Sequence, residues 1–305
     1  MIIEKRVNST TEGAQFTSSI TGMADGEYLV TWASYGPQPG IYSQRYDANN
    51  TKQGSEVLVN TTISGSNPAI TTLNNGGYVI TWSSIDQTGN VDIYALRFNA
   101  NGIAQGNEFK VNTFTDDYQD IPSITTLNNG DFVITWQSTN FTNFDTDIRG
   151  QRFDANGAAK GSEFLVNASD ATGNQLWGPV AALADGSFVV TWITDSRVIH
   201  GQRYDANGIA RGTALTIDSP NTFSSQGLST TALDGGSFMV TWSGNGEIYG
   251  QRFDANGISV GTEFKINTFS EGTALSTNVA TLSNGDFIVM WPSGSQDGYS
   301  TFDFG

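Results

Sequence analysis

Six tryptophans recur along the 305-residue chain, and each closes the same short phrase. The phrase is leucine or methionine, a polar turn with glycine, an aromatic residue, two apolar residues, and threonine (methionine in the last copy) before the tryptophan. The spacings are 50, 54, 56, 50 and 49 residues. A fixed period of about 50 residues is typical of repeat architectures, in which every copy is one small structural unit. The repeated residues are Trp32, Trp82, Trp136, Trp192, Trp242 and Trp291.

Each copy contains two predicted β-hairpins. Asn-Gly and Asp-Gly pairs, as at 75–76 and in the Asp-Ala-Asn-Gly turn at 254–257, lie between apolar runs. Such pairs adopt positive φ at little cost and are the strongest short-range hairpin signal. No segment has the 3.6-residue apolar period of a helix, so the chain is predicted to be all-β.

Six units of four antiparallel strands predict a six-bladed β-propeller that forms one domain over residues 1–305. A β-sandwich and an open solenoid are the alternatives. Residues 3–8 match the fourth strand of the unit, and residues 299–304 resemble its third strand. We therefore expect the N-terminal strand to complete the C-terminal blade and to close the ring.

Composition excludes several classes of function. The chain has no cysteine, which excludes disulfides and thiolate metal sites. Its net charge is −16. Nucleic acid and anionic membranes are disfavoured as partners, because both need clustered Lys and Arg. No apolar run is long enough to be inserted in a membrane. Residues 1–13 lack the apolar core of a classical signal peptide, which leaves other secretion routes open.

Segment lengths separate a fixed scaffold from variable loops. The phrase from the leucine or methionine to the tryptophan always spans the same distance, whereas the connections after the second and fourth strands vary in length. In an antiparallel blade these connections lie on one face, and loops on a fixed scaffold are where binding residues concentrate. The candidate ligand-binding residues on that face are Trp177, Gln175, Asn174, Tyr118, Tyr35, Phe223 and Arg197. Trp177, the one tryptophan outside the repeat, either stacks on a sugar or partner, or packs over a blade edge.

Carboxylates recur in the same loops. Asp86 with Asp92, and Asp145 with Asp147, supply the oxygen ligands that Ca²⁺ prefers, so these pairs are candidate calcium sites. No motif for a nucleotide, zinc or a serine nucleophile is present, and the single histidine, His200, has no partner set for catalysis. We therefore predict no catalytic residues.

An arginine recurs in the third strand at positions 45, 97, 152, 203 and 252. It is either a repeated ligand site or one half of a structural ion pair. The expected partner of such a pair is the turn Asp two residues later, or a glutamate of the fourth strand (Glu56, Glu108, Glu163, Glu263).

The phrases ALADGSFVVTW and IYGQRFDANG, followed by GxEFxVN, resemble a repeat of large secreted or surface-displayed bacterial proteins, the RTX-type and cadherin-like adhesins. The resemblance covers essentially the whole chain. It implies an extracellular or cell-surface location, adhesion, and calcium binding, although the calcium nonapeptides are absent.

Three functions remain at this point. The leading hypothesis is a non-enzymatic recognition module that binds a glycan or a protein surface through the variable-loop face. The alternatives are a structural or assembly subunit and a glycan-acting enzyme with two carboxylates in the funnel. The sequence leaves the ligand and the oligomeric state open.

Overall fold

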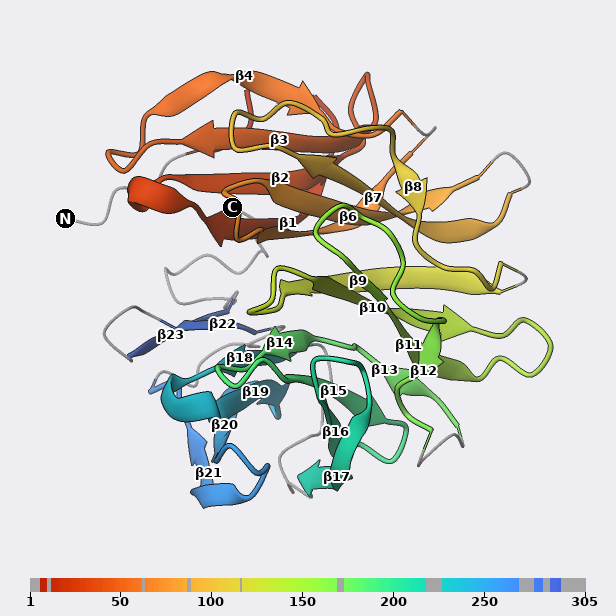
Figure 1. Cartoon of the computed structure of the whole chain (residues 1–305), viewed down its shortest axis with the longest axis vertical. Coiled ribbons are helices and arrows are strands. Elements are labelled where there is room, and N and C mark those ends of the chain that lie inside the picture. The colour runs from red at the N-terminus through yellow and green to blue at the C-terminus, as the bar shows by residue number, and fades with distance from the viewer. Residues whose placement is uncertain are drawn as a thin grey trace. The chain divides into compact units, whose positions relative to one another are not determined.

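The computed structural model describes residues 6–9, 12–61, 64–86, 89–115, 117–168, 173–217, 227–268, 277–281 and 286–291 (Figure 1). These residues form antiparallel β-sheets with two short 3-10 turns, η1 (Ala24–Gly26) and η2 (Asp234–Gly236). No helix among the described residues has the length and apolarity needed to cross a membrane. The prediction of an all-β chain is confirmed.

The first three sheets each contain four strands in sequence order, so that every strand pairs with its neighbour in the chain. The first sheet contains β1 (Gln15–Gly22), β2 (Tyr28–Ser34), β3 (Gly40–Tyr46) and β4 (Lys52–Leu58). The second contains β5 (Ser66–Thr72), β6 (Tyr78–Ile85), β7 (Val91–Phe98) and β8 (Phe109–Lys110). The third contains β9 (Tyr118–Thr126), β10 (Phe132–Thr139), β11 (Thr146–Phe153) and β12 (Phe164–Leu165).

The later sheets follow the same order. The fourth contains β13 (Gln175–Leu176), β14 (Val180–Ala182), β15 (Phe188–Thr194), β16 (Ile199–Tyr204) and β17 (Ala210–Ile217), with β13 and β14 both paired to β15. The fifth contains β18 (Leu228–Ala232), β19 (Phe238–Gly244), β20 (Glu247–Phe253) and β21 (Ser259–Lys265). The two-stranded sheet of β22 (Asn278–Thr281) and β23 (Phe287–Met290) ends the described chain.

The chain divides into two compact units. Unit 1 comprises residues 1–126, 130–144 and 149–164, and unit 2 comprises residues 127–129, 145–148 and 165–305. The first and second sheets lie in unit 1, as does most of the third, and the fourth and fifth lie in unit 2. The number of blades and the closure of a ring remain predictions.

The Asp-Ala-Asn-Gly turn forms because its aspartate accepts hydrogen bonds from the turn's own backbone. In the Asp-Ala-Asn-Gly turn, Oδ1 of Asp154 accepts from the backbone N–H groups of Asn156 and Ala158 at 2.8 and 2.9 Å. Gly157 then adopts φ +82°, a conformation that costs glycine little. The first copy has Asn50 at this position, and its φ of 62° confirms that asparagine replaces glycine there.

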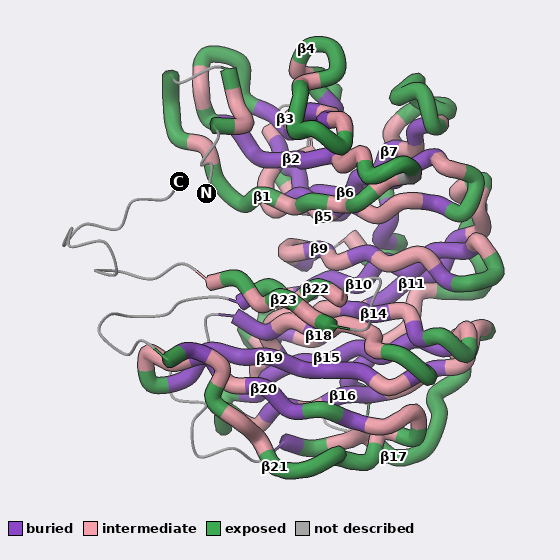
Figure 2. Tube along the Cα trace, turned by 90° about the vertical axis from the view of Figure 1, so that its left-hand side faces the viewer, coloured by how far each residue is buried: buried purple, intermediate pink, exposed green. Residues whose placement is uncertain are grey.

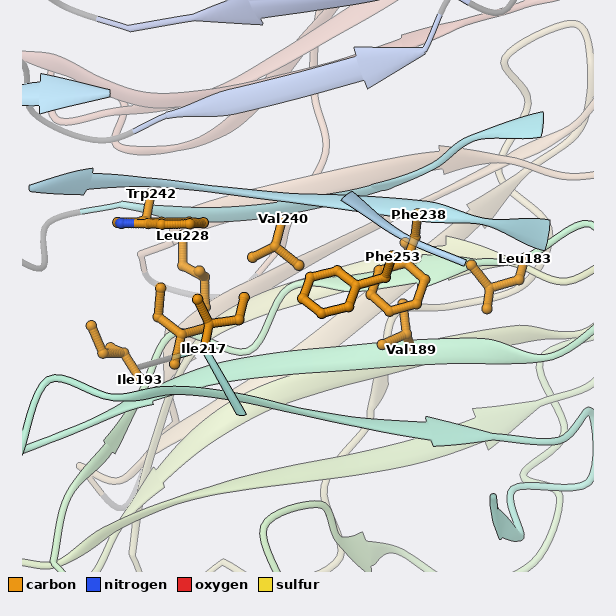
Figure 3. Packing of buried hydrophobic residues seen from close by; sticks show 11 residues of the cluster. Leu183, Val189, Ile193, Ile217, Leu228, Phe238, Val240, Trp242 and Phe253 are labelled. Carbon is orange, nitrogen blue, oxygen red and sulfur yellow. The ribbon is translucent and has the colours of Figure 1, made fainter. Parts of the chain in front are cut away.

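Two of the repeated tryptophans pack between successive sheets. Trp82 of the second sheet packs in one cluster with Leu29, Ala33 and Ile41 of the first. Trp242 of the fifth sheet packs with Ile193 and other apolar residues of the fourth (Figure 3). The tryptophan strands are the most buried strands of their sheets, and the fourth strands β4, β17 and β21 are largely exposed (Figure 2).

Two recurring side chains, an asparagine and a glutamate, hydrogen-bond the fourth strands to the third strands and to the preceding copy. An asparagine at the end of the strand accepts through Oδ1 from a backbone N–H of the third strand, as Asn112 does from Ile93 at 2.8 Å. The fourth-strand glutamate instead bonds the preceding copy. Glu108 accepts from the N–H of Thr61 at 3.0 Å, and Glu163 accepts from the N–H of Thr113 at 2.8 Å.

Arg45 and Arg97 do not pair as predicted, because they reach the turn of the following copy, whereas Arg152 pairs with Asp131 of its own sheet. Arg97 donates to the carbonyl oxygen of Asn156, and Arg45 donates to the carbonyl oxygen of Ala100 at 2.6 Å. Arg45 also pairs with Glu27, which precedes the tryptophan strand. The prediction of an ion pair with the arginine's own turn aspartate or fourth-strand glutamate is wrong. Arg45 and Arg97 instead join neighbouring copies of the repeat through backbone carbonyls.

Candidate functional site

The most chemically distinctive group of side chains in unit 1 gathers at the first strand of the third sheet. β9 bulges between its pairing with Thr135 and with Gln137, and Ile121 at the bulge has φ 52°. Pro122 follows, and it has no N–H to offer the ladder. The same bulge occurs in β1 and β5, so it belongs to the repeated scaffold, and in this copy the residue just before it is Asp120, which pairs with Gln137.

Asp120 accepts hydrogen bonds from both its own sheet and the second sheet. Its Oδ1 accepts from Asn67 Nδ2 at 2.9 Å, Ser83 Oγ at 2.5 Å and the backbone N–H of Ile121 at 2.8 Å. Its Oδ2 accepts from the Tyr118 hydroxyl at 3.3 Å. One carboxylate oxygen is therefore fixed by the scaffold, and the other faces a phenol.

Two aromatic pairs lie on the first and third sheets of unit 1, and we call them the aromatic walls. One wall is Tyr118 with Phe141, whose ring centroids are 6.2 Å apart. The other is Phe16 with Tyr35 of the first sheet, at 5.7 Å. Burial, the charge and hydrogen bond of Asp120, and the proximity of Tyr35 all raise the pKa of Tyr118. β5 packs beside both β1 and β9, and Phe16 holds in β1 the position that Asp120 holds in β9, so both walls lie at the same end of this row of first strands.

Both walls lie at the same end of their sheets. Tyr35 and Phe141 belong to connections between second and third strands, and Tyr118 begins a first strand. In an antiparallel meander these positions share one edge, which is the variable-loop side of the sequence analysis. Three wall residues stay substantially exposed: Phe16 at 49%, Tyr35 at 49% and Phe141 at 55%. The walls are thus open to a ligand.

A phenol bonded to a carboxylate is a chemically useful pair. The carboxylate oxygen can take the phenolic proton, which makes the phenol oxygen a nucleophile, and a tyrosine of raised pKa needs such a base. Phe16, Phe141, Asn67 and Asp120 were not among the predicted site residues. The signal was available at one of these positions, because Asp120 stands where Phe16, Ser66 and Leu176 stand in other copies.

The predicted ligand residues divide between the two units. Tyr35 and Tyr118 lie at the same edge of their sheets, as described. In unit 2, Trp177 packs against the apolar cluster that contains Ile193, Leu228 and Trp242, which is the second of its two predicted roles. Phe223 lies outside the described residues.

The other predicted residues of unit 2 mainly organise loops. Asn174 accepts from the N–H of Thr146 at 3.0 Å and donates its own N–H to Asp195 at 2.9 Å. Gln175 is fully buried and donates to the carbonyl oxygen of Gly173 at 3.3 Å. Arg197 is exposed on its loop and has φ 65°.

The predicted calcium ligands of the second sheet surround a lysine. Lys110 pairs with the fully buried Asp92 and lies 3.5 Å from Asp86. Burial works to lower the pKa of Lys110, but the hydrogen bond and charge of Asp92 raise it. The ammonium group therefore supplies the positive charge that these two carboxylates need.

In unit 2, Asp147 accepts from Asn167 Nδ2 at 2.8 Å. Asp145 is half-buried just before β11. Across the described part of the chain, no three His, Cys, Asp or Glu side chains gather as a metal site would require. Calcium remains a prediction of the sequence alone. His200 stacks on Trp192, with ring centroids 5.8 Å apart, where other copies place tyrosine or arginine.

A groove lies between the first and second sheets. It encloses about 390 Å³ and is lined by Val57, Leu58, Phe98 and Ala104, with Glu108 at its edge. Val57 stands where the next copy has Phe109, whose ring lies 5.5 Å from that of Phe153. The groove therefore marks a missing phenyl ring. Glu108 is engaged with Thr61, so this groove offers no catalytic pair.

Comparisons with known proteins identify the fold. No protein-family model matches the chain, and the search of curated proteins finds no match. Among solved structures, an α-L-arabinofuranosidase from Fusarium graminearum with an iminosugar inhibitor is 14% identical, with a TM-score of 0.66 over 93% of this chain and 89% of that one. An α-L-arabinanase from Penicillium chrysogenum with arabinobiose is 17% identical, with a TM-score of 0.64 over 92% and 89%. NanB sialidase from Streptococcus pneumoniae is 10% identical, with a TM-score of 0.66 over 96% and 67%.

Identities this low establish the fold alone, which is a β-propeller built of four-stranded antiparallel sheets. The neighbouring structures also correct the leading functional prediction. These structures, which share the fold over most of the chain, are glycosidases, so the predictions of a non-enzymatic recognition module and of no enzymatic activity are overturned. The glycan-acting enzyme, one of the two alternatives from the sequence, agrees better with these neighbours.

Proposed function

We propose that this chain is a glycan-acting enzyme that hydrolyses glycosidic bonds at the Asp120 cluster of unit 1. The observation that carries the proposal is the Tyr118–Asp120 pair, a phenol bonded to a carboxylate and flanked by exposed aromatic rings. Its support from the fold is the likeness to an arabinofuranosidase, an arabinanase and a sialidase.

In the proposed reaction, the Tyr118 phenol attacks the anomeric carbon while Asp120 Oδ2 takes the phenolic proton. A tyrosine nucleophile is one of the known exceptions to the paired-carboxylate rule of glycosidases. The leaving oxygen departs with the electron pair of the glycosidic bond and takes a proton from water. Water then hydrolyses the glycosyl-tyrosine bond, the proton that it loses neutralises the hydroxide left by the first step, and the proton on Asp120 returns to the phenolate. The bonds from Asn67, Ser83 and Ile121 keep Asp120 in place throughout.

The test uses aryl glycosides, whose leaving groups depart without an acid catalyst. The wild-type chain should release nitrophenol from at least one member of a panel that includes the α-L-arabinofuranoside. Asp120→Asn and Tyr118→Phe should each lower kcat by about 10²- to 10⁴-fold, the usual contribution of a base or nucleophile pair. Tyr42→Phe removes the same hydroxyl elsewhere in unit 1 and should leave kcat unchanged. No turnover by the wild-type chain, or full activity in both site variants, would refute the proposal.

We further propose that the propeller has six blades and that the N-terminal segment supplies an outer strand to the last one. The support is that this segment contacts the first sheet as a fourth strand contacts the next copy. Glu56 accepts from Ser9 Oγ at 2.6 Å, as Glu163 does from Thr113 Oγ1 at 2.9 Å. The Tyr46 hydroxyl donates to the carbonyl oxygen of Val7 at 3.3 Å, as that of Tyr204 does to Val166 at 3.0 Å.

A further inference from the structure

The aromatic walls leave a large apolar area exposed in unit 1. Phe16, Tyr35 and Phe141 each expose about half of their surface, although every one contacts another ring. Exposed apolar groups that gather in one place and are bordered by polar groups mark a binding site. Scattered surface aromatics would need no such explanation.

The polar groups next to the walls match a sugar better than an apolar ligand. Ser83 is fully buried, and together with Asn67 it holds Asp120 in place, so the Tyr118 hydroxyl and the Asp120 carboxylate are the polar groups that can meet a sugar. A sugar ring has an apolar C–H face that lies against an aromatic ring, and hydroxyl groups at its edge that need partners. Walls with a polar base provide both kinds of contact.

The charges near the walls indicate an uncharged sugar. Asp120 is the acidic group of the cluster, and the chain carries a net charge of −16. Lysines and arginines of the described chain pair with acids of the scaffold, as Lys110 does with Asp92 and Arg149 does with Glu163. In the hydrogen bonds and ion pairs of the described residues, no cationic side chain contacts a wall residue or Asp120. A carboxylated sugar would meet repulsion there without a compensating cation.

We infer that the substrate is a neutral oligosaccharide, held by stacking against the exposed wall residues Tyr35 and Phe141. This inference rests on the proposed function for the location of the reacting bond. The wall residues are substrate-positioning residues, because they hold sugar rings and take no part in proton transfer. Their loss should therefore weaken binding and leave the chemical step intact.

The experiment measures binding to the Asp120→Asn chain by calorimetry, so that turnover does not interfere. The neutral probes are arabinotetraose, xylotetraose and maltotetraose, and the acidic probes are tetragalacturonate and sialyllactose. We expect at least one neutral probe to bind at least tenfold more tightly than both acidic probes. Tyr35→Ala and Phe141→Ala should each weaken that binding by about fivefold or more, since one stacked ring contributes on the order of 1 kcal/mol.

Phe144→Ala is the matched control. Phe144 lies in the same loop as Phe141 and is 70% exposed, and it has no ring contact with another described aromatic residue. Its removal should leave binding unchanged. Tighter binding of an acidic probe, or wall variants that bind like the control, would overturn the inference.

The two proposals fail in different ways. If the wall variants weaken the binding of a neutral probe but the wild-type chain hydrolyses no glycoside, the proposed function is wrong and the inference on binding holds. If Asp120→Asn abolishes hydrolysis while Tyr35→Ala and Phe141→Ala keep the wild-type KM, the active site is supported and the inference on the walls is wrong.

Discussion

Replacing Asp120 by alanine should destabilise unit 1, because the carboxylate ties the second sheet to the third. Three donors lose their acceptor: Asn67 Nδ2, Ser83 Oγ and the N–H of Ile121. A hydrogen bond to a charged group contributes about 1.5–3 kcal/mol, but three donors share one oxygen here and Asp120 is only half-buried. We therefore expect a loss of about 2–4 kcal/mol in the free energy of unfolding.

Asp120→Asn separates stability from catalysis. The amide oxygen can replace Oδ1 as the acceptor of all three bonds, so the loss should stay below about 1 kcal/mol. Urea denaturation and calorimetry measure both variants. The alanine variant should lower the melting temperature by about 5–15 °C, at roughly 2–4 °C per kcal/mol for a unit of this size. An alanine variant within about 0.5 kcal/mol of the wild type would refute the idea that this carboxylate joins the sheets.

The remaining predictions concern the scaffold. Val57→Phe should restore the missing ring of the groove and raise the free energy of unfolding by about 1 kcal/mol in urea denaturation; a loss of stability would show that the groove cannot accept a ring. Burial raises the pKa of Tyr78 to about 12 against a partial lowering by Arg45. The unfolded chain therefore releases this proton first, so the stability is complete below pH 10 and falls by about 1–3 kcal/mol as the pH rises to 12. Tyr78→Phe should flatten this fall, and an unchanged slope would contradict the assignment. Deleting residues 1–9 should cost about 1–2 kcal/mol, since Glu56 and Tyr46 lose partners, and Glu56→Gln should then add little; full additivity of the two changes would argue against the contact.

The sequence was a good guide wherever a residue has a local task repeated in every copy. The turn glycines and asparagines predicted the hairpins, because positive φ is a property of single residues. The tryptophans had to be buried, since they are large apolar side chains on strands, and Trp82 and Trp242 pack between sheets. The repeated arginine shows the limit of this reasoning. Its partner, a backbone carbonyl about 55 residues further along the chain, has no signature in the sequence.

The candidate site was only partly predictable for the same reason. Tyr35 and Tyr118 were selected because they lie on variable loops, and the structure places both at the same edge of their sheets, each beside a phenylalanine. Asp120 escaped attention because its environment depends on a bulge and on side chains of another sheet, neither of which a pattern of strands reveals. Trp177 stood out by its rarity, yet rarity does not distinguish a packing residue from a binding residue.

A structure of the Asp120→Asn chain with a bound neutral oligosaccharide tests the central claim most directly. The account predicts a sugar ring against Tyr35 or Phe141, with the anomeric carbon near the Tyr118 hydroxyl and within about 3.5 Å of it, the separation of a reactive complex. Sugar bound only at another place on the chain, or with its anomeric carbon far from Tyr118, would contradict it.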